Sequence, residues 1–161
     1  MRVALLVLLA ALVGAAVPAR ADRPPADANV VARFCAKAAS QYDINQCAGK
    51  VGKAADQELN ATYQAVLKKW AAYPDMINKL RQGQRAWLSY RDADLAARFA
   101  GSDGPSRGTA YPAAYALYQA SLERERTARL CSYLRGTAYG EQDSAPCADL
   151  VRDPAVVPSA P

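Results

Sequence analysis

The chain has 161 residues with a net charge of +5, and it contains four cysteines and no histidine. A length of this size is typical of a single domain. Acidic residues are interspersed with basic ones along every expected helical stretch, so the chain lacks the one-sided basic face of a nucleic-acid binder. We therefore expect no nucleic-acid partner.

The first 21 residues contain the charged start, the apolar run and the cleavage site of a secretory signal peptide, in that order. Arg2 precedes an unbroken apolar run over 3–13, and the small residues that follow end in Ala19-Arg20-Ala21, an Ala-x-Ala cleavage site. The apolar run is shorter than the ~20 residues that a transmembrane helix needs, and no later stretch approaches that length. We predict cleavage after Ala21, which gives a soluble periplasmic or secreted protein without a membrane span. An uncleaved membrane anchor is the alternative.

The cysteines all lie in the predicted mature part. An even number of cysteines in an exported protein predicts disulfides, here two. A metal site is the alternative, but the chain has no histidine, no Cys-x-x-Cys motif and long cysteine spacings. Three connectivities are open from the sequence, and we prefer the local one, Cys35 with Cys47 and Cys131 with Cys147. No metal or cofactor is expected.

The interior of the chain is expected to be helical, because it is rich in Ala, Leu, Gln, Arg and Lys and lacks the alternating apolar pattern of strands. A short helix is expected over 30–39. A long helix follows from an N-cap at Asp43 to about Trp70, with apolar residues at steps of three and four. Pro74 opens the next helix, which ends at Gly101.

The segment 101–108 contains four helix breakers and is the clearest loop. A third long helix is expected from about Pro112 to Arg135. The predicted fold class is all-α, with antiparallel helical hairpins forming a small disulfide-stapled helix bundle. Its domain spans 33–136, between a flexible N-terminal segment over 22–32 and a disulfide-tied, Pro-rich C-terminal tail over 137–161.

A polar cluster is predicted between the first two long helices. If these helices fold back about Tyr73, residues whose numbers sum to roughly 146 face each other. Leu59 then meets Trp87, and Val66 meets Leu80, in an apolar core. The polar residues of the same seam pair as Asp56 with Arg91, Asn60 with Arg85, and Tyr63 with Gln84.

We interpret this cluster as a buried, structural polar network that fixes the register of the hairpin. Arg91 and Gln84 fall on an apolar stripe, so they need polar partners. A ligand-binding or catalytic site is the alternative. However, an acid paired with an arginine is held ionised and suits acid–base catalysis poorly, and no nucleophile with an activating base accompanies it.

Two motifs carry a resemblance to a known family. They are Asp56-Gln-Glu-Leu-Asn-Ala-Thr-Tyr63 and Gln84-Arg-Ala-Trp-Leu-Ser-Tyr-Arg-Asp92. In this order they resemble the LprI-type lysozyme-inhibitor N-terminal domain, over nearly everything from Cys35 to Leu130. Shorter matches are Cys47-Ala48, Leu80, Leu122 and Glu125-Arg126-Thr127.

The resemblance implies a small exported helical protein of the bacterial envelope that binds lysozyme or another envelope protein and is not an enzyme. The chain departs from the family pattern at Leu95, where many members carry a cysteine, and near Tyr118, where many carry another. These positions are centred on the 101–108 loop, and the Cys131–Cys147 pair is a candidate substitute for the bridge they would form.

The surface charge differs from what an inhibitor of a cationic lysozyme would favour. Loss of Arg2 and Arg20 with the signal peptide leaves a mature net charge of +3, whereas a negative surface would attract lysozyme. Four acids are candidates for a local acidic patch, but arginines lie among them, so we interpret them as part of a mixed solvated face. These acids are Asp92, Asp94, Glu123 and Glu125.

Two functional hypotheses follow. The first is an exported, non-catalytic binding protein that acts by occluding a protein partner, with lysozyme as the expected partner. The second is an envelope module with a structural or stress-related role and no lysozyme contact. A hydrolase is poorly supported, because no histidine is present and no two carboxylates are placed convincingly for glycoside chemistry. The sequence assigns no partner-binding residues.

Overall fold

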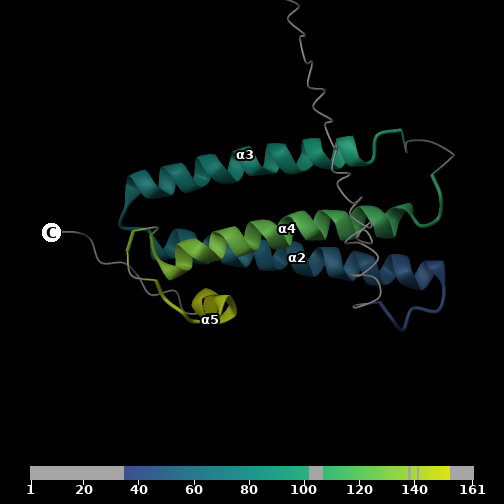
Figure 1. The fold of residues 1–161 in the computed structure, drawn as a ribbon, viewed down its shortest axis with the longest axis horizontal. Coiled ribbons are helices and arrows are strands. Elements are labelled where there is room, and N and C mark those ends of the chain that lie inside the picture. Colours follow the sequence, from purple (N-terminus) through teal and green to yellow (C-terminus); the bar gives the residue numbers. More distant parts are fainter. Residues whose placement is uncertain (1–34, 102–106, 138, 141, 153–161) are drawn as a thin grey trace, which may run out of the picture.

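The computed structural model describes residues 35–101, 107–137, 139–140 and 142–152. The helices are α2 (Gln41–Lys69), α3 (Pro74–Arg98), α4 (Tyr111–Arg135) and the short α5 (Cys147–Arg152). None of the described residues forms a strand, so the predicted all-α fold class is confirmed. Figure 1 shows the long helices lying alongside one another with successive helices running in opposite directions, α2 beside α4, and α3 on one side of that pair.

Several sequence predictions fall on residues that the structure does not describe. The signal peptide over 1–21 and the segment over 22–32 both lie outside the described residues. The helix expected over 30–39 lies partly outside, and its described part is a turn closed by the Ala38 N–H and the Cys35 carbonyl oxygen at 2.9 Å. That part of the prediction is wrong, because the chain folds back here to bring Cys35 to Cys47.

Helix α2 begins at Gln41 because Ser40, and not the predicted Asp43, is its N-cap. The Ser40 Oγ accepts a hydrogen bond from the Asp43 N–H at 3.1 Å and donates one to Asp43 Oδ2 at 2.7 Å. This reciprocal arrangement resembles a capping box and satisfies an N–H group that the helix leaves unpaired. The other predicted boundaries are close, since Pro74 opens α3 and Gly136 follows the end of α4.

The core lies mainly between α2 and α4. At one end, small buried residues such as Ala48, Ala55 and Ala120 line the contact, and their size lets the two helices approach closely. At the other end, larger side chains fill the space, including Val66 and Trp70. The Trp70 indole Nε1 donates to the Tyr133 carbonyl oxygen of α4 at 2.9 Å, so its polar atom is satisfied although the ring is buried.

Helix α3 packs mainly on α4 and contacts α2 less. Leu59, Trp87, Val66 and Leu80 still share one apolar cluster, as the predicted hairpin register requires. That cluster also contains Leu130 and other α4 residues. The third long helix therefore completes the core, and the first two do not form an isolated hairpin.

Both predicted disulfides are present, Cys35–Cys47 and Cys131–Cys147, each with a Cα–Cα distance of 5.8 Å. The second bridge holds α5, a helix within the segment expected to be a Pro-rich tail. Leu150 of α5 is buried in the same cluster as Leu59 and Leu134. The described part of the tail thus contributes to the core. None of the described helices is long and apolar enough to cross a membrane.

An aromatic cluster joins the far end of α3 to the beginning of α4. The Phe99 ring lies 5.5 Å from Tyr111, 5.1 Å from Tyr115 and 5.9 Å from Tyr118, measured between ring centroids. The Tyr118 hydroxyl donates to Asp94 Oδ2 at 2.7 Å. These contacts connect the end of α3, where Leu95 is buried, to the beginning of α4.

Candidate functional site between helices α3 and α4

Polar side chains from α3 and α4 meet between these two helices. Helix α3 contributes Gln84 and Arg91, while α4 contributes Gln119, Glu123 and Arg126. We refer to these five residues as the polar layer. Gln84 and Arg91 belong to the network predicted from the sequence, and the structure adds the three residues of α4.

A fully buried carboxyl group lies at the centre of the polar layer. The side chain of Glu123 is 0% exposed, and its Oε1 accepts a hydrogen bond from Gln119 Nε2 at 2.7 Å. Its Oε2 has no hydrogen-bond partner among the described residues. Burial raises the pKa of Glu123, with a smaller contribution from the Asp56 charge, while the Gln119 hydrogen bond and the Arg91 charge act in the opposite direction.

Arg91 connects α3 to this carboxyl group. Its Nη1 lies 3.7 Å from Glu123 Oε1, and its Nε and Nη2 donate to Asp92 Oδ1 at 2.9 and 2.8 Å. The guanidinium carbon also lies 5.5 Å from the centroid of the Trp87 ring. The predicted pairing of Arg91 with Asp56 is therefore wrong, because α4 faces this part of α3 and supplies the acid.

Gln84 and Arg126 form a second connection between α3 and α4. Gln84 is 8% exposed, and its Oε1 accepts from Arg126 Nε at 3.0 Å. The Arg126 guanidinium lies 5.9 Å from the centroid of the Trp87 ring. Burial lowers the pKa of Arg126, Tyr133 and Tyr63 act in the opposite direction, and the neighbouring Arg129 charge has a smaller lowering effect. Gln84 was expected to pair with Tyr63, but Tyr63 packs against the apolar cluster of the core.

The remaining members of the predicted network are exposed. Asn60 Nδ2 donates to Asp56 Oδ2 at 3.1 Å within α2, and both residues face solvent. Arg85 is exposed on α3, where its carbonyl oxygen accepts from Ser89 Oγ at 3.2 Å. The expected burial of these residues is wrong, because α3 packs on α4 and leaves these positions of the α2–α3 seam open. Their structural role stays a prediction.

Glu123 was expected on a solvated face, and its burial is a correction. It lies between Ala120 and Thr127 at steps of three and four residues, and all three are buried on α4. This periodicity continues to Leu130 and could have placed Glu123 on the buried stripe. The arginines near it in the sequence obscured the signal.

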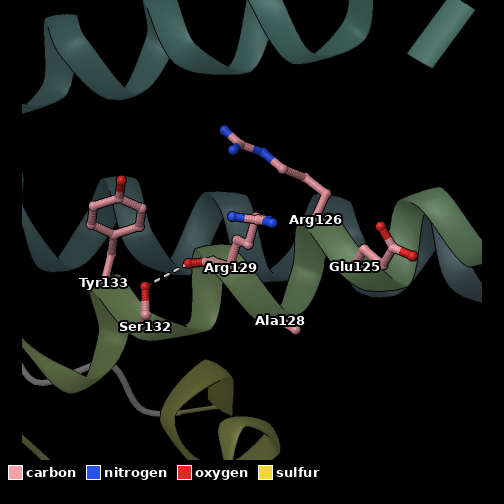
Figure 2. Close-up of a pocket in the computed structure, with 6 residues that line it drawn as sticks. All are labelled: Glu125, Arg126, Ala128, Arg129, Ser132 and Tyr133. Carbon is pink, nitrogen blue, oxygen red and sulfur yellow. Dashed lines mark hydrogen bonds between the residues drawn. The ribbon is translucent and has the colours of Figure 1, made fainter. Parts of the chain in front are cut away.

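A hollow of about 670 Å³ lies beside the polar layer on α4. Figure 2 shows Arg126 and Tyr133 directed toward the α3 side, with Arg129 between them. The Ser132 hydroxyl donates to the Arg129 carbonyl oxygen at 2.7 Å. The lining residues are Glu125, Arg126, Ala128, Arg129, Ser132 and Tyr133.

A family model described as lysozyme inhibitor LprI matches residues 35–130. The chain belongs to the LprI lysozyme inhibitor family. An uncharacterized protein of Rhizobium meliloti (strain 1021) is 36% identical over 124 residues, which cover 70% of this chain and 82% of that protein. No solved structure matches the chain.

The LprI match contains the first disulfide, α2, α3 and the whole polar layer. It ends at Leu130, immediately before Cys131. The second disulfide and α5 therefore lie beyond the matched range, although Leu150 packs into the same core. The hollow spans this limit, since Arg129 lies within the LprI match and Tyr133 follows it.

Proposed function

We propose that this LprI protein is an exported, non-catalytic binding protein that inhibits lysozyme by occluding it. The observation that carries the proposal is the LprI match over 35–130, which includes most of the described helical core. The disulfides Cys35–Cys47 and Cys131–Cys147 support a periplasmic or secreted location, because such bonds persist in oxidising compartments.

The polar layer supports a binding role more than a catalytic one. Glu123 is fully buried, so a substrate would have to displace neighbouring side chains to reach its carboxyl group. Arg91 is engaged by both Asp92 and Glu123. All four cysteines are in disulfides and offer no thiolate nucleophile. We therefore infer that the protein acts by binding a partner at its surface.

The alternative is an envelope module with a structural or stress-related role and no lysozyme contact. The charge of the chain favours this alternative. The chain has a net charge of +5, and +3 after loss of Arg2 and Arg20. A cationic lysozyme would be repelled at long range by such a partner, which lowers the association rate.

The two proposals are separated by the rate at which lysozyme clears a suspension of bacterial cell walls. The protein beginning at Asp22, with its disulfides intact, is expected to slow clearing with a dose response that saturates near one inhibitor per enzyme. Protein that has been reduced and alkylated is the control and is expected to lose the effect with its fold. No inhibition at stoichiometric excess, across lysozymes of several types, would exclude the first proposal and favour the alternative.

A further inference from the structure

Two arginines beside the hollow on α4 have no carboxylate partner among the described residues. Arg126 and Arg129 are one helical turn apart, and both line the hollow. Neither forms an ion pair with an acid in the part of the chain that the structure describes. Glu125 also lines the hollow, but Figure 2 shows its carboxylate turned away from both guanidinium groups.

Arg126 is held in position before any ligand binds. Gln84, which is buried, accepts the hydrogen bond from Arg126 Nε at 3.0 Å, and the Trp87 ring lies against the guanidinium. Use of Nε leaves the two terminal nitrogens for another acceptor. A planar guanidinium fixed in this way suits the bidentate recognition of a carboxylate.

The pair of arginines is unfavourable for the isolated protein. Arg126 is half-buried, and a desolvated cation without an acid costs free energy. The adjacent Arg129 adds a like charge that disfavours the cationic form of Arg126. An anion bound between the two groups would remove both penalties, so the arrangement is typical of a binding site for an anion.

The hollow extends far enough for a chain segment. A second hollow of about 470 Å³ shares Ser132 and Tyr133 with the first and reaches Met76 of α3. Its lining also includes Thr137 and Gln142, which offer hydrogen-bonding groups next to the apolar Met76 side chain. The combined surface therefore has a cationic end and a mixed apolar and polar end.

We propose that this surface binds an acidic segment of a protein partner, with a partner carboxylate seated between Arg126 and Arg129. That the partner is a protein rests on the proposed function. The acidic chemistry of the contact is the new part of the inference.

Binding of a hexaglutamate peptide to the mature protein tests the proposal, measured by calorimetry and by NMR signals of the arginine Nε–H groups. We expect saturable binding that shifts the Arg126 and Arg129 signals and weakens as salt is added. Arg129→Gln is expected to weaken binding about tenfold, as for loss of one charge-assisted contact. Lys53→Gln removes the same charge from an exposed position on α2 and is expected to bind as the wild type does.

A second variant separates geometry from charge. Arg126→Lys keeps the positive charge but loses the planar fork, so it is also expected to weaken binding, and thermal melts check that each variant is folded. Equal binding by wild type and Arg129→Gln would overturn the proposal. So would equal binding of hexaglutamine, or binding of inorganic phosphate at the two arginines without any binding of hexaglutamate.

The same variants in the cell-wall clearing assay separate this proposal from the proposed function. Arg129→Gln is expected to raise the concentration needed for half-inhibition about tenfold, while Lys53→Gln leaves it unchanged. Inhibition by wild type and Arg129→Gln alike would refute the acidic contact and leave the inhibitor function standing. Hexaglutamate binding at the arginines without lysozyme inhibition would support the acidic contact and exclude lysozyme as the partner.

Discussion

At the scale of single residues, Glu123 couples the fold to pH. Its pKa is raised by burial, so the folded state holds the carboxyl proton at pH values where the unfolded chain has released it. Stability from this group is therefore fully present below the ordinary pKa of 4.5 and is lost as the pH rises through the raised value. Burial of the carboxyl group is the main cause of this dependence, and the Oε2 atom has no hydrogen-bond donor among the described residues that would favour the ionised form.

Replacing Glu123 by Gln removes this titration. We expect the free energy of unfolding to fall less for Glu123→Gln than for the wild type between pH 4.5 and neutral pH, because the group no longer ionises. Urea unfolding at several pH values measures the difference. The exposed Glu125→Gln is the control and should keep the wild-type slope. Parallel pH profiles for Glu123→Gln and the wild type would contradict the prediction.

Arg91 compensates the same carboxyl group from α3. At a pH where Glu123 is ionised, Arg91→Met is expected to destabilise the protein by about 3 kcal/mol, because removal of one partner leaves the buried Glu123 charge without its cation. The double variant with Glu123→Met should recover a large part of this loss, since no charge is then left buried. Urea unfolding of both variants tests the pair. Additive losses in the double variant would show that the two residues are not coupled.

At the scale of the helices, Asp56 shows why the polar partners were harder to predict than the helices. The predicted boundaries of α2, α3 and α4 are close to the observed ones. They depend on local signals, namely the spacing of apolar residues, Pro74 and the glycines at helix ends. The choice of partner helix is set by the whole packing arrangement. Helix α4 takes the place next to α3 that the sequence register gave to α2, so Arg91 meets Glu123 and Asp56 stays exposed.

The exposure of Asp56 leads to a weak expected effect. The sequence register alone would make Asp56→Ala cost several kcal/mol, as for the loss of a buried charge partner. In the structure Asp56 accepts a hydrogen bond from the exposed Asn60, so we expect a change within about 0.5 kcal/mol. Thermal melts of Asp56→Ala decide between these values. A loss of several kcal/mol would instead support the buried network that the sequence register predicts.

The disulfides were predictable for a different reason. An even set of cysteines after an export signal indicates pairing, and short separations of 12 and 16 residues favour the local connectivity. Helix α5 was missed because it is only six residues long and lies among prolines. Its formation depends on Leu150 reaching the core and on the bridge from Cys131, and neither contact has a local signal.

Removal of the second bridge tests the contribution of α5. The variant Cys131→Ala with Cys147→Ala is expected to lose about 3 kcal/mol, as the chain-entropy model gives for a closed loop of this size. Proteases should then cut more rapidly in the segment between Gly136 and α5, because α5 docks less firmly. Leu150→Ala keeps the bridge and is the matched control for lost packing. An unchanged melting temperature in the double variant would show that α5 docks without the bridge.

At the scale of the whole molecule, the structure divides into a tightly packed pair of helices and a third helix on one side of it. Seven residues of α2 and nine of α4 are buried, against only Leu80, Gln84 and Leu95 in α3. Besides the core contacts of Leu80, two sets of contacts join α3 to α4. They are the polar layer and the aromatic cluster around Tyr118, whose hydroxyl bonds to Asp94.

Native-state hydrogen exchange should therefore show lower protection in α3 than in α2 and α4, because a helix with few buried contacts opens before the global unfolding transition. Tyr118→Phe removes the hydroxyl that binds Asp94 and is expected to speed exchange in the second half of α3 while the α2 amides stay unchanged. Similar protection of all three helices would instead show that α3 unfolds together with the α2–α4 pair.

A separately opening α3 would also expose Glu123, whose ionisation would then favour the open form as the pH rises through the raised pKa. Exchange in α3 should for that reason speed up with pH beyond the intrinsic chemical rate, and Glu123→Gln should abolish the excess.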